Sequence, residues 1–412
     1  MGLATCSHPK ETSFSVPQTF TTPQDTPQGF DASRLARIDT ALQQLVDKGL
    51  LPHAVTFVAH RGEIVHFKAF GWRDIEKQIP CEKDDIFRIA SQTKAIAVVA
   101  LMTLFEEGKF QLDEPIKKYL PEFAQMQVLT RYLPRDTTYR TRPAARDITI
   151  RHLMTHTSGI SYNGDHWAIM EKHGVPPLNS LENVTLEEVV KRLATLPLAH
   201  DPGDRFTYSM NIEVLGRLAE VLSGKPIDVF IRERVLDPLG MNDTYFYLPD
   251  DKADRLVTLY ACPKGEPLQR SKHPIYQSYP MAGAKTYFST GAGLSGTISD
   301  YARFCQMILN KGEFNGQRIL GRKTIELMMQ NNVRDLRGDI GFGLAWDVFR
   351  PQYGYASIVS EGASRWGGMF GSDYVIDPQE EIIMLLYINL LPNQTGIDFK
   401  TLMHNVTYQA LL

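Results

Sequence analysis

Residues 87–108 read FRIASQTKAIAVVALMTLFEEG, a short apolar segment that runs into a long helical pattern. Apolar residues recur at helical spacing from Ala95 to Leu104, and the pattern ends near Gly108. This arrangement predicts a strand that enters a helix, with Ser91 at the point of entry. The unbroken apolar run after Lys94 predicts that this lysine is buried against the core. Because burial of a charged amine costs free energy, a buried lysine indicates a functional role.

The segments on either side of this helix predict a sheet that is assembled from both ends of the chain. A helix is expected from Ala32 to Gly49, followed by a hairpin with strands at 54–59 and 63–70 around an Arg61-Gly62 turn. Further helices are expected at 187–194, 212–222, 227–235, 299–309 and from about Phe399, and further strands at 340–348, 368–376 and 382–388. Strands at both ends with helices between them predict one sheet with an inserted helical domain.

Three parts are predicted along the chain. Residues 1–30 are polar, contain four prolines and show no apolar period, so we interpret them as an extended leader. Residues 31–90 together with 285–412 are predicted to form an α/β (α+β) sheet domain. Residues 91–284 are predicted to form a mostly helical domain, with the functional site between the two.

Composition excludes several classes of protein. The 412 residues carry a formal net charge of -3, which implies no basic face for nucleic acid. No apolar run reaches the roughly 18 residues of a membrane span. The four cysteines, Cys6, Cys81, Cys262 and Cys305, are far apart and are interpreted as free thiols. His152 and His156 lack further ligands at suitable spacing, so no metal or other cofactor is predicted.

The first residues of the chain bear on the cellular location of the protein. They lack the charged region and apolar run of a secretory signal, which predicts a cytoplasmic product. An exported or lipid-anchored form stays open if the true start lies upstream of Met1. The sequence leaves the oligomeric state open.

Ser91 and Lys94 form the first chemical motif. They are three residues apart and therefore share one helical face, so the hydroxyl and the amine can touch. Burial favours the neutral form of a lysine, which can then accept the serine proton. Tyr208, between a turn at 201–204 and a helix, could share that proton. The alternative for the bare motif is a capping serine with a solvated lysine, and for Tyr208 an aromatic packed at a helix start.

Four ordered segments carry a specific resemblance. They are Ser91-x-x-Lys94, Leu153 to Ile160 (LMTHTSGI), Asp201-Pro202-Gly203 to Tyr208-Ser209, and Ala292 to Tyr301 (AGLSGTISDY). Together they resemble the serine β-lactamase superfamily in its class C-like branch, especially the family VIII carboxylesterases and the fungal statin acyltransferases. The similarity runs from about residue 31 to the C-terminus. It implies an antiparallel sheet flanked by helices, Ser91 as nucleophile, and Lys94 and Tyr208 as the proton-transfer pair.

The resemblance also implies an oxyanion hole. Trp366-Gly367-Gly368-Met369 corresponds to the strand that carries Lys-Thr-Gly in β-lactamases, which assigns the hole to the backbone N–H groups of Ser91 and Met369. Glycines at this place let an acyl group approach the backbone closely. The alternative for Gly367 and Gly368 is a bulge or turn in an edge strand.

Departures from the β-lactamase pattern point to the substrate. No Lys-Thr-Gly stands at this strand, so a lactam carboxylate loses its usual cation, and Asn211 comes one residue later than in Tyr-x-Asn. Trp366 offers apolar contact to an acyl or alkoxy group, and Tyr162 is expected to line the pocket. We therefore predict a serine carboxylesterase acting on a small-molecule ester. The alternatives are an acyltransferase to an alcohol, a β-lactamase or D-aminopeptidase, and a non-catalytic binding protein of the same fold.

Overall fold

The N-terminal helix and hairpin form the outer edge of the molecule. The structure, a computed structural model, describes residues 19–21, 29–338, 340–350 and 358–412, so most of the predicted leader lies outside the described residues. The helix predicted after Ala32 forms in two pieces, α1 (Ala32–Leu35) and α2 (Arg37–Asp47). The hairpin is confirmed as β1 (His53–His60) and β2 (Glu63–Asp74), and its two turn residues, Arg61 and Gly62, both have positive φ.

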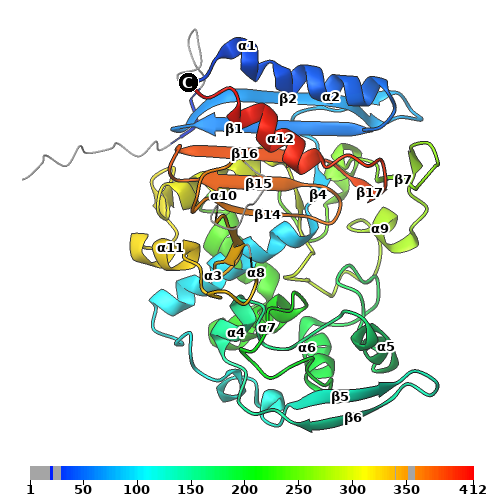
Figure 1. Cartoon of the computed structure of the whole chain (residues 1–412), viewed down its shortest axis with the longest axis vertical. Coiled ribbons are helices and arrows are strands. Elements are labelled where there is room, and N and C mark those ends of the chain that lie inside the picture. Colours follow the sequence, from blue (N-terminus) through cyan, green and yellow to red (C-terminus); the bar gives the residue numbers. More distant parts are fainter. Residues whose placement is uncertain (1–18, 22–28, 339, 351–357) are drawn as a thin grey trace, which may run out of the picture.

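An eight-stranded sheet joins the two ends of the chain in the order β12-β13-β14-β15-β16-β1-β2-β3. Every neighbouring pair in it is antiparallel. The new strands are β3 (Ile79–Pro80), β12 (Gly341–Phe342), β13 (Asp347–Val348), β14 (Ser364–Gly367), β15 (Asp373–Asp377) and β16 (Ile382–Tyr387). The N-terminal and C-terminal strands meet where β1 pairs with β16, with Val55 opposite Tyr387 (Figure 1). The predicted antiparallel sheet is therefore confirmed.

Helices cover both faces of this sheet. β1 and β16 are buried along their whole length, and their successive residues point into two different cores. Val58 and Leu386 pack in one core with α1, α2 and α12 (Phe399–Tyr408). Phe57 and Leu385 pack in the other with α3 (Thr93–Glu106) and α10 (Ile298–Leu309). Because α3 is apolar all around, it is buried from Thr93 to Leu104.

The helical part occupies the lower half of Figure 1. It consists of α3, α4 (Ile150–Met154), α5 (Asp165–Lys172), α6 (Leu186–Ala194), α7 (Asn211–Ser223) and α8 (Ile227–Ile231), with a hairpin of β5 (Gln127–Leu133) and β6 (Thr138–Pro143). α3 and α7 pack together at its centre. The division into a sheet domain and a helical domain stays a prediction.

The remaining elements are short. They are β4 (Phe87–Arg88), β7 (Tyr260–Cys262), β8 (Gln269–Arg270), β9 (Ser295–Gly296), β10 (Glu313–Phe314), β11 (Gln317–Arg318), β17 (Leu390–Asn393), α9 (Pro274–Ser278) and α11 (Arg322–Met329). β4 pairs with β9, which fixes the segment that leads to Ser91.

Three predicted elements differ from the structure. The strand expected at 340–348 is a tight hairpin, because the backbone N–H of Gly343 bonds to the carbonyl of Trp346 between β12 and β13. The strand expected at 368–376 is the turn that leaves β14 followed by β15, and Gly371 has φ 105° in that turn. The helix expected at 227–235 continues after α8 as one π-helical turn at Arg232–Leu236. An apolar run alone gives no sign of such turns.

Candidate active site

Ser91 lies in a 3₁₀ turn at 90–92, between β4 and α3. The preceding residue, Ala90, has φ 44°, a conformation that residues with a Cβ rarely adopt. A buried guanidinium holds this segment in place: Arg88 donates hydrogen bonds to the carbonyls of Tyr279, Val257 and Gln277 at 2.6–2.9 Å. The strained turn is therefore anchored from both sides, as expected where a reactive side chain must be held in one position.

The Lys94 amine is held against the Ser91 hydroxyl. Nζ lies 3.2 Å from Oγ of Ser91 and 2.7 Å from the carbonyl oxygen of Gly291. The side chain is buried, as the sequence predicted, and this desolvation lowers the pKa of Lys94 to about 7. The amine is therefore partly neutral near pH 7 and can accept the serine proton, since its lone pair is then free.

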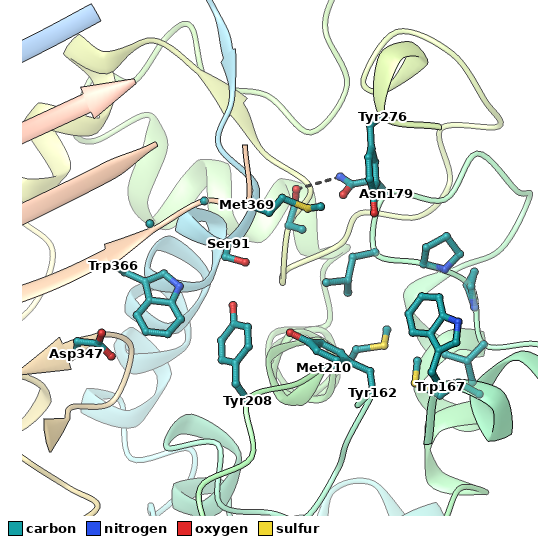
Figure 2. A pocket seen from close by; sticks show the side chains of 18 of the residues that line it. Ser91, Tyr162, Trp167, Asn179, Tyr208, Met210, Tyr276, Asp347, Trp366 and Met369 are labelled. Carbon is teal, nitrogen blue, oxygen red and sulfur yellow. Dashed lines mark hydrogen bonds between the residues drawn. The ribbon is translucent and has the colours of Figure 1, made fainter. Parts of the chain in front are cut away.

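Tyr208 comes from the loop before α7 and completes the cluster. Its ring lies 4.8 Å from Nζ of Lys94, and in Figure 2 its hydroxyl points toward Ser91. Burial raises the pKa of Tyr208, although interactions with Ser91 and Trp366 lower it in part. Neither contact forms a hydrogen bond of standard geometry, and the buried phenolic oxygen has no partner among the described residues. The phenol is therefore protonated near neutral pH and unoccupied by other bonds.

Two segments recognised in the sequence hold Tyr208 in place. The loop after α4 accepts backbone hydrogen bonds at 2.7 Å from Thr207 to His156 and from Gly203 to Thr157. The buried His156 ring lies 4.5 Å from the Tyr208 ring, and its Nδ1 is 2.9 Å from the amide nitrogen of Asn211. Burial holds the pKa of His156 well below its usual range, so this ring stays neutral. The structure thus uses His156 to support the loop.

Glycines bring the predicted oxyanion segment close to Ser91. A Cβ added to Gly368 would lie 2.4 Å from the carbonyl oxygen of Ile89, in the segment just before Ser91. A Cβ added to Gly367 would lie 2.6 Å from Nζ of Lys400. Only glycine fits these two places, and Met369 follows them directly (Figure 2). Ser91 and Met369 both line one cavity, and the assignment of their backbone N–H groups to an oxyanion hole stays a prediction.

Glu213 is a buried acid that the sequence reasoning missed. Its carboxylate accepts hydrogen bonds from Oγ of Ser289 at 2.6 Å and from the backbone N–H groups of Thr290 and Gly291 at 3.0 Å. It therefore fixes Gly291, the residue whose carbonyl oxygen accepts a hydrogen bond from Lys94. Burial raises the pKa of Glu213, while its hydrogen bonds and Lys94 oppose that rise, and Glu213 in turn raises the pKa of Lys94. The sequence feature that could have identified Glu213 is the presence of an acidic residue among the apolar residues of α7.

A cavity of about 800 Å³ opens at Ser91 and has two unlike ends. One end is apolar and is formed by Tyr162, Trp167, Met170, Val175, Pro176 and Leu178. The other end, beyond Trp366, carries the charged side chains of Arg337, Asp347, Arg365 and Lys400. Figure 2 shows Trp167 and Asp347 on opposite sides of Ser91. All residues that the sequence placed at the substrate, Tyr162, Trp366, Gly367 and Gly368, line this cavity.

The sheet, the inserted helices and the Ser-x-x-Lys cluster together define a protein of the β-lactamase fold. The chain belongs to the Beta-lactamase family, whose model matches residues 38–406. This family lies within the superfamily of serine hydrolases and acyltransferases.

Among its relatives, Protein Rv1367c of Mycobacterium tuberculosis is 35% identical over 372 residues, which cover 86% of this chain and 89% of that protein. Esterase EstB of Burkholderia gladioli is 29% identical over 384 residues, 87% of this chain and 91% of EstB. Among solved structures, EstCE1, described as a hydrolase with promiscuous acyltransferase activity, aligns with TM-score 0.77 and 27% identity. The alignment covers 92% of this chain and 99% of EstCE1.

The described part of the chain contains no group of three or more His, Cys, Asp or Glu side chains placed to hold a metal ion. No helix among the described residues has both the length and the apolar character to cross a membrane.

Proposed function

We propose that this protein is a serine carboxylesterase that hydrolyses a small-molecule ester through an acyl-enzyme on Ser91. The observation that carries this proposal is the contact of 3.2 Å between the Ser91 hydroxyl and the buried Lys94 amine, at the floor of an 800 Å³ cavity. Esterase EstB and EstCE1, which cover most of the chain, support the same class of reaction.

The geometry suggests how the proton moves. Lys94 takes the proton of Ser91 while Oγ attacks the ester carbonyl carbon, and the backbone N–H groups of Ser91 and Met369 bind the oxygen that becomes negative. Because burial keeps Tyr208 protonated, its phenol is the donor that protonates the leaving alcohol, and Lys94 returns a proton to Tyr208. Water then attacks the acyl-enzyme by the reverse sequence, which releases the acid and restores Ser91.

Acyl transfer to an alcohol is the second candidate. EstCE1, a hydrolase with promiscuous acyltransferase activity, favours it, and the two-ended cavity has room for an acceptor beside the acyl group. β-Lactam or D-amino-acid peptide hydrolysis ranks third. A non-catalytic binding protein of this fold is the alternative outside enzymes, and it predicts that Ser91 reacts with no acylating reagent.

The proposal is tested by a screen of 4-nitrophenyl esters of increasing chain length, together with intact-protein mass spectrometry of the trapped acyl-enzyme. We expect hydrolysis and a mass increase of one acyl group on the intact protein, which peptide mapping should assign to the peptide that contains Ser91. Product analysis with added alcohols separates hydrolysis from transfer, and nitrocefin turnover comparable to ester turnover would favour the β-lactamase. Absence of labelling by both esters and a fluorophosphonate would leave only the binding protein.

The pH dependence of ester turnover should report the state of Lys94. Protonated Lys94 cannot accept the serine proton, so kcat/KM should rise with pH through an apparent pKa of about 7. Glu213 raises the pKa of Lys94, so Glu213→Gln should move this midpoint to lower pH. The measurement is kcat/KM on a neutral ester between pH 5 and 9.

Glu220→Gln is the matched control, because Glu220 lies on the same helix but pairs with Arg217 at 3.0 Å instead of acting on Lys94. Its midpoint should equal that of the unmodified protein. A Glu213 variant that is slower with an unmoved midpoint would show that Glu213 only maintains the fold and does not set the pKa of Lys94.

A further inference from the structure

Three cationic side chains line the end of the cavity beyond Trp366. Arg337 precedes β12, Arg365 lies in β14 and Lys400 lies in the first turn of α12, so three distant segments contribute to one wall. Two carboxylates are among the lining residues, Asp347 at this end and Glu171 at the other, where it accepts a hydrogen bond from Nε1 of Trp167. The pair of Asp347 with Arg337 leaves this wall of the cavity positively charged.

Each arginine already has an acidic partner, but Lys400 does not. Arg337 pairs with Asp347, and Nη2 of Arg365 lies 3.6 Å from the carboxylate of Asp373. Asp373 also lies 2.9 Å from Nε2 of His404, and Lys400 acts on it only through its more distant charge. Among the described residues, the Lys400 ammonium has no ion pair and no hydrogen bond. It is therefore the cation available to a ligand.

Lys400 lies beside the predicted oxyanion segment and lines the same cavity as Ser91. A Cβ on Gly367 would come within 2.6 Å of Nζ, so the ammonium lies directly over the strand residue two places before Met369. On the same wall, the buried Nε1 of Trp366 has no hydrogen-bond partner among the described residues. A ligand oxygen that reached Lys400 would therefore belong to a molecule whose ester group lies at Ser91.

We propose that the natural substrate carries a carboxylate in addition to the ester, and that Lys400 binds this carboxylate. The proposal rests on the esterase function proposed above. Arg337 pairs with Asp347, and Arg365 interacts with Asp373 and Asp398, so among the described residues Lys400 is the cation of this wall without an ion pair. A single unpaired ammonium fits a singly charged carboxylate better than a doubly charged phosphate. The apolar end of the cavity, around Trp167 and Leu178, would then hold the uncharged part of the same molecule.

Two matched substrate pairs test this inference, one for each side of the ester bond. For the acyl side they are mono-4-nitrophenyl glutarate and its methyl ester, and for the alcohol side 4-(butyryloxy)benzoate and its methyl ester. We expect the charged member of one pair to have a kcat/KM about 10- to 100-fold above the neutral member, because a charge-assisted bond forms in a partly desolvated site. This preference should shrink in 0.5 M NaCl, since salt screens it.

Lys400→Met should lose that preference and leave turnover of the neutral esters within about threefold, whereas Lys400→Arg should keep most of it. Lys48→Met, at an exposed position that does not line the cavity, is the control for the loss of one positive charge. Turnover of the neutral esters tests the proposed esterase function and the integrity of the fold, and it does so independently of the preference for a charged ester. The inference would be overturned if the wild-type enzyme hydrolysed the neutral esters without preferring either charged ester. It would also be overturned if Lys400→Met lowered the turnover of the charged and the neutral ester by the same factor.

Discussion

Ser91→Ala is expected to reduce kcat/KM for 4-nitrophenyl esters by about 10⁴-fold or more, to near the uncatalysed rate. The variant removes the oxygen that forms the acyl bond, and no other described hydroxyl lies within hydrogen-bond distance of the Lys94 amine. The thermal stability should change little, because the lost hydroxyl makes one hydrogen bond among the described residues, to Lys94. Steady-state kinetics and a thermal melt of the same preparation measure both effects.

Ser364→Ala provides the matched control, because Ser364 is also buried, has a hydroxyl without a partner among the described residues and does not line the cavity. That variant should retain wild-type kinetics and should still take up one acyl group. Full ester turnover by Ser91→Ala would remove the proposed mechanism altogether, whatever the behaviour of the control.

Tyr208→Phe is expected to lower kcat by about 10²- to 10⁴-fold and to change KM much less. In the proposed mechanism the phenol donates the proton that the leaving alcohol needs, and its buried oxygen has no hydrogen bond to lose among the described residues. The loss should be smaller for a 4-nitrophenyl ester than for an alkyl ester, because nitrophenolate leaves without a proton. Comparing these two leaving groups therefore distinguishes proton donation from packing.

Tyr387→Phe is the control for this variant. Tyr387 is a buried tyrosine of β16 whose hydroxyl also lacks a partner among the described residues, and it lies outside the cavity wall. Equal losses for both leaving groups in Tyr208→Phe would mean that the hydroxyl maintains the arrangement of the neighbouring aromatic side chains, Trp366 at 5.2 Å among them, and donates no proton.

The fold was largely accessible from sequence patterns, because local periodicity reports which side of an element is buried. It predicted the long buried helix after Ser91, the first hairpin and a sheet made from both ends of the chain. It failed at 340–348 and 368–376, where a tight turn lies inside an apolar run. The strands on both sides of such a turn are buried and therefore apolar, so the hydrophobic pattern does not reveal where the turn lies.

The sequence alone therefore determined the chemistry that lies within one helical turn, because Ser91 and Lys94 are brought together by the helix itself. The tertiary structure decided what surrounds them. Glu213 comes from α7 and binds Gly291, whose carbonyl oxygen accepts a hydrogen bond from Lys94, and Lys400 reaches the cavity from the last helix. No local spacing encodes such contacts, because the packing of whole elements sets the distance between residues that are far apart in the chain.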